Sequence, residues 1–126
     1  MKTKMIATHI ESILIITGAA TAITLIQFIA PSQVLRMIYG EAPTDKIGLG
    51  LARHWGLLIF CVGVLLMYAA FHPQVRDPAM VFGATEKIAL GIGVLGTSLR
   101  RHAVAATIAA GDSFIALIYI GYLAGF

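Results

Sequence analysis

The stretch IGLGLARHWGLLIFCVGVLLMYAAF, residues 47–71, decides the fold of this chain. A helix needs about 20 consecutive, mostly apolar residues to cross the hydrocarbon core of a bilayer, and this run exceeds that length. Arg53 is its only formally charged residue. A run this long and this apolar predicts a membrane-spanning α-helix.

Three more apolar runs of similar length occur at residues 5–30, 78–99 and 103–126. Apolar residues make up 59% of the 126 residues and charged residues only 12%, about half the usual charged share. Lipid solvates apolar side chains, so a chain of this composition is stable in a bilayer without a polar surface. We therefore predict an all-α integral membrane protein, multi-pass, with residues 1–126 as a single transmembrane domain.

The connections between the runs predict the topology. Residues 72–78 form a short polar turn in which Asp77 is expected to cap the third helix and Pro78 to take its first position. Residues 100–102 form an equally short turn. Short connections make successive helices antiparallel neighbours, which predicts an up-down-up-down four-helix bundle with both termini on one side.

The connection between the first two spans has a pattern of its own. Residues 32–39 place Val34, Leu35, Met37 and Ile38 on one side and Arg36 on the other, and Gly40 follows as a stop. That spacing predicts a short helix lying in the plane of the membrane interface.

The N-terminus imitates a cleavable signal peptide. Lys2 and Lys4 precede an apolar run that reaches Ala20-Thr21-Ala22, which has the form of a cleavage site. Glu11 interrupts that run, which also continues past the site to Ala30. We therefore expect the segment to be retained as the first span.

The net charge of +3 comes from 9 basic and 6 acidic residues that are scattered along the chain, which argues against nucleic-acid binding. Basic loops beside apolar spans instead predict contacts with membrane lipids. Small residues at four-residue spacing, such as Gly48, Ala52 and Gly56, favour close helix packing. Four short spans leave much surface free, so we also expect a homo-oligomer or a larger membrane-protein partner.

Five charged residues fall inside the predicted spans: Glu11, Arg53, Glu86, Lys87 and Asp112. A charge in hydrocarbon costs at least about 2.5 kcal/mol, so each must pair, lose its charge or reach water. Distances along the helices place Glu11 at the depth of Glu86 and Lys87, and Asp112 at the depth of Arg53. We therefore predict two polar layers, one for each set.

Two neighbouring residues complete this candidate polar network. Tyr119 lies on the helical face of Asp112 and is expected within its reach. His54 follows Arg53, and the pair either joins the buried layer or marks the membrane interface, with Trp55 as an interfacial anchor. The sequence leaves both alternatives open.

Motifs for other chemistries are missing. The sequence has no HExxH and only one cysteine, so we expect neither a metal site nor catalytic residues. Haem held by His9 with His72, or by His54 with His102, remains an alternative to the expectation of no cofactor. The glycines at positions 91, 93 and 96 lie inside a span and follow no strand, so we interpret them as packing residues.

In layout the chain resembles the small four-helix bacterial membrane proteins of the DoxX-like kind. The resemblance rests on Arg53-His54-Trp55-Gly56, on residues 69–73 with Arg76 and Pro78, and on Glu86-Lys87 and Asp112. It implies an accessory or scaffold protein of the bacterial inner membrane without catalytic residues, and that is the function we expect.

Two alternative functions follow from the same polar residues. The chain also resembles small multidrug resistance transporters, which would make Glu11 a proton- and cation-binding carboxylate; charges at Arg53, Lys87 and Asp112 depart from that family. A membrane enzyme acting on a lipid would require Asp112, His54 and Tyr119 to converge on one cavity.

Overall fold

The computed structural model describes residues 5–126, and the part of the chain it describes contains helices and no strand. Four segments are long and apolar enough to cross a membrane: Ile10–Ile29, Lys46–Phe71, Pro73–Leu95 and Ala103–Leu123. The predictions of an all-α chain and of four helices long and apolar enough to cross a membrane are therefore confirmed. The elements are α1 (Met5–Thr8), α2 (Ile10–Ala22), α3 (Leu25–Ile29), α4 (Pro31–Tyr39), α5 (Lys46–Phe71), η1 (Pro73–Val75), α6 (Arg76–Leu95), η2 (Ser98–Arg101) and α7 (Ala103–Leu123).

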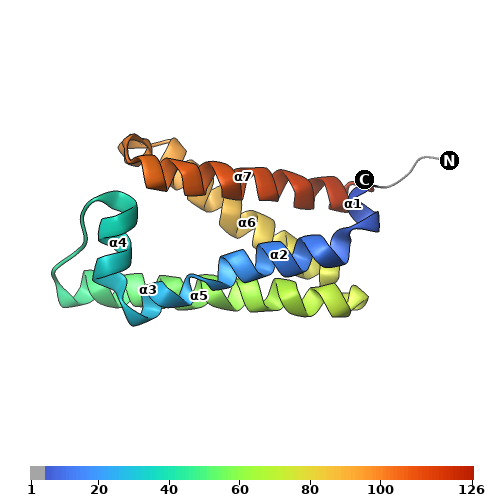
Figure 1. The fold of residues 1–126 in the computed structure, drawn as a ribbon, viewed down its shortest axis with the longest axis horizontal. Coiled ribbons are helices and arrows are strands. Elements are labelled where there is room, and N and C mark those ends of the chain that lie inside the picture. Colours follow the sequence, from blue (N-terminus) through green and yellow to red (C-terminus); the bar gives the residue numbers. More distant parts are fainter. Residues whose placement is uncertain (1–4) are drawn as a thin grey trace.

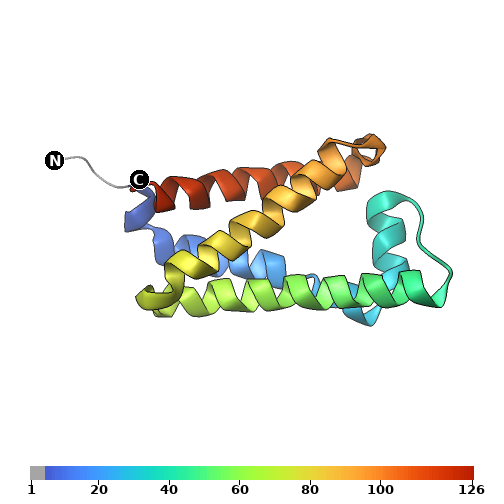
Figure 2. The ribbon, with the colours of Figure 1, turned by 180° about the vertical axis from the view of Figure 1, so that it is seen from behind.

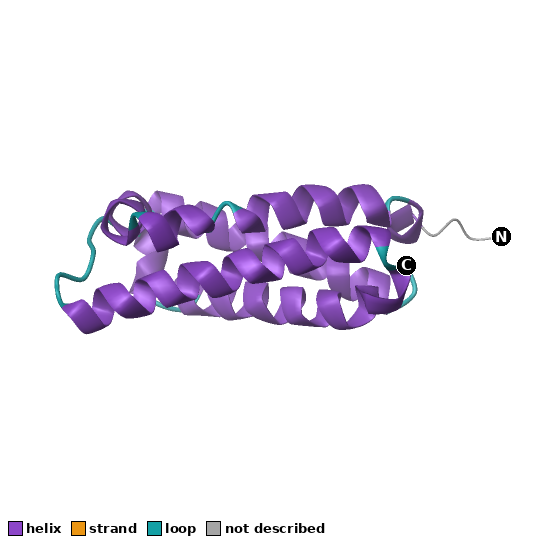
Figure 3. Ribbon diagram, turned by 90° about the horizontal axis from the view of Figure 1, so that it is seen from below, coloured by secondary structure: helices purple, strands orange, loops and turns teal. Residues whose placement is uncertain are grey.

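The long helices form two packed pairs. Helices α2 and α3 lie along α5, while α6 packs against α7. Figure 1 shows α5 and α7 along opposite edges of the molecule, and Figure 2 shows α6 running obliquely from the end of α5 towards the start of α7. The connections lie mostly at the two ends (Figure 3). The chain ends at the same side as α1, where the Ala7 amide donates to the Phe126 carbonyl over 3.3 Å.

Glycine allows the first pair of helices to approach closely. A Cβ added to Gly63 of α5 would lie 2.5 Å from the Ala22 nitrogen and 2.6 Å from the Gly18 carbonyl oxygen. Backbone atoms cannot move aside as a side chain can, so only glycine fits there. On α7, Ala105, Ala109 and Ala116 are buried. Small residues of the spans thus pack within the chain, as expected for close helix contacts.

The third span begins earlier than the sequence predicted. The turn η1 leads directly into α6 at Arg76, and Val75 stands at the N-cap position without a side-chain cap. The predicted cap by Asp77 is therefore wrong. Asp77 and Pro78 lie in the first turn of α6, where backbone N–H groups have no intrahelical acceptor and proline is tolerated.

Helix α4 occupies the stretch predicted to form a short helix. It begins at Pro31 and ends at Tyr39, and the next residue, Gly40, has a φ of 81°, a left-handed conformation that glycine adopts readily. Figure 1 shows α4 lying across the direction of the long helices at the end opposite the termini. Most of the buried core, including Leu14, Leu66 and Tyr119, lies in the other half of the molecule.

Candidate functional site

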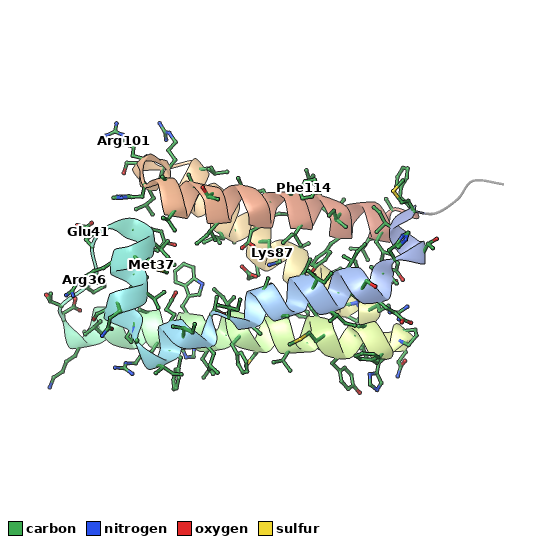
Figure 4. The ribbon with its side chains drawn as sticks, viewed as in Figure 1. Arg36, Met37, Glu41, Lys87, Arg101 and Phe114 are labelled. Carbon is green, nitrogen blue, oxygen red and sulfur yellow. The ribbon has the colours of Figure 1, made fainter. Side chains whose placement is uncertain are left out.

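Lys87 is the buried charge on which the candidate site is centred. It lies midway along α6, and only 1% of its surface is exposed. Figure 4 shows it on the side of α6 that faces α2. An ammonium group at such a position requires partners, because neither lipid nor apolar side chains can solvate it.

Three side chains from three helices surround the ammonium group. Lys87 Nζ donates to Thr21 Oγ1 of α2 over 2.8 Å. It lies 3.3 Å from Asp112 Oδ1 of α7 and 3.6 Å from Glu86 Oε1 of α6. The carboxylate-bearing side chains are 20% and 15% exposed respectively. One cation therefore ties together α2, α6 and α7 through what we call the Lys87 cluster: Thr21, Glu86, Lys87 and Asp112.

Hydrogen bonds fix the protons around this cluster. The Thr21 hydroxyl donates to the Thr17 carbonyl over 2.7 Å, so its oxygen is left to accept from Lys87. The Thr17 hydroxyl likewise donates to the Ile13 carbonyl, so the Tyr119 phenol donates to Thr17 Oγ1 over 2.5 Å. Two threonines one turn apart thus connect α2 to both α6 and α7.

Glycines on either side of Lys87 bring α6 close to its neighbours. A Cβ at Gly91 would lie 2.5 Å from Ser113 Oγ, and one at Gly83 would lie 3.1 Å from Leu66 and from Tyr119. Gly83, Lys87 and Gly91 recur every four residues and therefore share one helical face. The close approach places Asp112 of α7 within reach of the ammonium group. These glycines act in packing, as the sequence indicated for Gly91.

Glu11 and Lys87, which were predicted to share a polar layer, do not pair. Glu11 lies one residue inside α2, with 69% of its side chain exposed, and its Oε1 is 3.6 Å from Arg76 Nη2. Arg76 also donates to the carbonyls of Ala69 and Ala70 at the end of α5. Glu11 belongs to a surface ion pair at the end of the helices, so the first predicted polar layer does not form.

Asp112 and Arg53, which were placed in the second predicted layer, do not pair either. Asp112 pairs with Lys87, whereas Arg53 is exposed and donates to the Phe28 carbonyl over 3.2 Å. His54 is exposed as well, and Trp55 is 58% exposed. The structure therefore gathers Glu86, Lys87 and Asp112 into one cluster and leaves Glu11, Arg53 and His54 outside it.

Tyr119 lies fully buried near the cluster but bonds to Thr17 rather than to Asp112. A lipid-acting enzyme would need Asp112, His54 and Tyr119 around one cavity. A large cavity between the helices is lined by Met37, Trp55 and Ile108 among others, but by none of these three residues. His54 is exposed, whereas Tyr119 is buried. The geometry gives this alternative no support.

Three of the four histidines, His9, His72 and His102, lie at the ends of the spans, whereas His54 lies within α5. His9 Nδ1 donates to the Met5 carbonyl over 3.0 Å, and His72 Nδ1 donates to the Tyr68 carbonyl over 2.9 Å and stacks on the Tyr68 ring. Among residues 5–126, no three His, Cys, Asp or Glu side chains gather in a way that could hold a metal ion.

Thr17, Thr21 and Arg76 are the polar partners that sequence reasoning missed. The threonines share one face of α2 with the buried Leu14, and that four-residue spacing is visible in the sequence. Threonine is common in membrane helices for reasons of packing alone, so the spacing becomes informative only once a buried charge faces it.

The Lys87 cluster holds one cation and two carboxylates, so it carries one net negative charge when both acids are ionised. Glu86 Oε1 is buried and receives no hydrogen bond. Such a cluster can bind a proton and can fix the packing of three helices. Comparisons with protein-family models, with curated proteins and with solved structures give no match for this chain.

Proposed function

We propose that this chain is a multi-pass accessory or scaffold protein of a membrane, in which the Lys87 cluster fixes the helix packing on which assembly depends. The burial of Lys87 carries the proposal: only 1% of the residue is exposed, and its partners come from α2, α6 and α7. A buried ion pair of this kind adds little net stability over apolar residues but selects one arrangement of helices.

The proposed topology is an up-down-up-down bundle with both termini on one side. Its support is the contact of Ala7 with Phe126 and the shortness of the turns η1 and η2. Large apolar side chains, among them Ile16, Phe82 and Phe114, are exposed along the long helices, as expected of surfaces that face lipid. The DoxX-like layout adds the inner membrane of a bacterium as the proposed location.

Single-cysteine labelling tests this topology. In a Cys61→Ser background, Thr44→Cys and Ser98→Cys should react with an impermeant maleimide from one side of the membrane, and Gln74→Cys from the other. Labelling of all three positions from the same side would contradict four crossings.

The accessory role predicts a homo-oligomer or a complex with a membrane-protein partner. In mild detergent after cross-linking in the membrane, the wild-type protein should run as an assembly heavier than the 13.4 kDa chain. Asp112→Asn, which removes a charge facing Lys87, should reduce that assembly. Glu11→Gln is the matched control, because Glu11 is exposed and lies outside the cluster. A wild-type protein that remains a single chain would contradict the accessory role.

A further inference from the structure

A large cavity occupies the half of the molecule in which the two helix pairs stand apart. Its volume is about 870 Å³, and it lies between α3 and α5 on one side and α6 and α7 on the other, with α4 across its end. Pockets that bind small molecules measure about 300–1,000 Å³, so the cavity is large enough for a ligand.

The wall of the cavity is apolar. Trp55 of α5, Met37 of α4, Ile26 of α3 and Ile108 of α7 all line it, and all four are partly open to the surroundings. Figure 4 shows Met37 on the side of α4 that faces the long helices, whereas Arg36 points the opposite way. The cavity therefore presents hydrocarbon to whatever enters from the membrane.

Two polar side chains of the wall already donate to backbone carbonyls. Gln27 Nε2 donates to the Ala52 carbonyl over 2.9 Å, and the Thr24 hydroxyl donates to the Thr21 carbonyl over 2.8 Å. A ligand with polar groups along its length would lose hydrogen bonds to water without replacing them here. The wall thus favours an occupant whose inserted part is hydrocarbon.

Basic residues outnumber acidic residues at the α4 end of the molecule, where the cavity lies. Arg36, Arg53 and Arg100 each adjoin, in sequence, a residue of the cavity wall: Met37, Ala52 and Leu99 respectively. Lys46 at the start of α5 and Arg101 in η2 add positive charge at this end of the molecule, against the carboxylates of Asp45 and of Glu41, which itself lines the cavity. Burial raises the pKa of the Tyr39 phenol, so Tyr39 adds no negative charge.

We propose that this cavity binds one acyl chain of an anionic phospholipid, with the phosphate at the α4 end of the molecule, where basic residues outnumber acidic ones. Acyl chains are the solvent around the spans and fill an apolar opening, whereas water finds few partners there. The amphipathic helix α4, whose Met37 and Ile38 line the cavity, lies at the level where a headgroup would sit. Positive charges at that level select an anionic headgroup over a zwitterionic one.

Trp55 is the only tryptophan of the chain and lines the cavity, so it reports on the occupant directly. The protein in an uncharged detergent is titrated with phosphatidylglycerol carrying brominated acyl chains, which quench tryptophan fluorescence on contact. Brominated phosphatidylcholine is the zwitterionic comparison. Quenching by the anionic lipid should saturate. Half-maximal quenching should require at least about fivefold less phosphatidylglycerol than phosphatidylcholine, because each basic residue near the headgroup contributes about 1 kcal/mol to binding.

Two substitutions on one helix test where the lipid binds. Ala20 lines the cavity and Ala19 does not, although both are exposed on α2. Ala20→Phe should abolish the saturable quenching, and Ala19→Phe should leave it unchanged. If Ala20→Phe loses helical content by circular dichroism, Ile108→Phe fills the cavity from α7 instead. Arg53→Gln and Arg100→Gln should each weaken the binding of the anionic lipid by about fivefold without changing the binding of phosphatidylcholine.

Several results would overturn the proposal. Linear, unsaturable quenching by both lipids would mean that Trp55 meets only bulk lipid. Saturable quenching at equal concentrations of the two lipids would mean that the arginines do not select the headgroup. Saturable quenching that persists in both Ala20→Phe and Ile108→Phe would mean that the lipid binds outside the cavity. Absence of quenching together with a dimeric mass by light scattering would assign the cavity to a second copy of the chain.

Discussion

The two halves of this molecule are built differently. Near the termini, Leu14, Leu66 and Tyr119 are fully buried where the two helix pairs meet, and this packed half continues to the Lys87 cluster. At the α4 end, the same helices stand apart around a cavity, and Trp55 and Met37 remain exposed. The comparison shows that a helix such as α5 can serve packing over one part of its length and leave a binding surface over another.

The largest loss of stability is expected from Lys87→Met. It leaves the largely buried carboxylates of Asp112 and Glu86 without their cation, and breaking a buried ion pair costs about 3–5 kcal/mol. The free energy of unfolding in detergent measures the effect. Lys46→Met is the control, because Lys46 is exposed at the start of α5, and it should change stability by less than about 0.5 kcal/mol. Equal stability of the two variants would mean that Lys87 is not buried.

Two leucines of α5 compare the halves directly. Leu66 is fully buried in the packed half, whereas Leu51 lines the cavity and is largely exposed. Leu66→Ala should cost about 2–5 kcal/mol in unfolding free energy because it leaves a cavity. Leu51→Ala should cost less than about 0.5 kcal/mol. Similar losses at both positions would show that the α4 half is as closely packed as the other.

Two glycines of α5 test the contact between α5 and α2. Gly63→Ala should destabilise the protein by about 1–3 kcal/mol, since its Cβ would meet the backbone of Ala22 and Gly18. At Gly50, no atom lies within 4 Å of an added Cβ. Gly50→Ala should therefore raise the free energy of unfolding by up to about 1 kcal/mol, because alanine has the higher helix propensity. The melting temperatures of the two variants should therefore move in opposite directions. A higher melting temperature for Gly63→Ala would contradict the close approach of α5 to α2.

The smallest effect is expected at the phenol of Tyr119. Tyr119→Phe removes the hydrogen bond to Thr17, and such bonds between membrane helices are worth about 0.6 kcal/mol on average. Tyr68→Phe is the control on an exposed tyrosine. Thr17→Val combined with Tyr119→Phe should cost less than the sum of the single changes. Strict additivity would argue against the bond.

The four long apolar helices were predictable because the length and apolar composition that a membrane span requires can be read directly from the sequence. The pairing of the charged residues was not predictable in the same way. The depth of each charge was counted from the expected end of its span, and those ends lie elsewhere in the structure. The first span begins at Ile10 rather than at residue 5, which moves Glu11 to its end, and the third begins at Pro73 rather than at residue 78, which moves Lys87 deeper. Five residues of helix correspond to about 7.5 Å, more than the reach of an ion pair.

The partners of Lys87 also depend on features that a sequence pattern does not contain. Asp112 reaches Lys87 because α6 and α7 lie close together at that level. Gly91 permits this approach, since a Cβ at that position would collide with Ser113. Thr21 reaches the ammonium group because Gly18 and Gly63 set how α2 lies on α5. Both contacts follow from how the helices are rotated about their axes. The cavity is equally hard to predict from the sequence, because its wall residues come from six separate α-helices, α2 to α7.

A double-mutant cycle on Lys87→Met and Asp112→Asn tests most directly whether the buried ion pair holds the packed half together. If the two groups interact as the 3.3 Å separation indicates, the double variant should be more stable than the sum of the single losses implies. The interaction energy in unfolding free energy should be at least about 1 kcal/mol, within the range found for contacting residues. Losses that add within about 0.3 kcal/mol would contradict the account, because they would mean that Lys87 and Asp112 act independently.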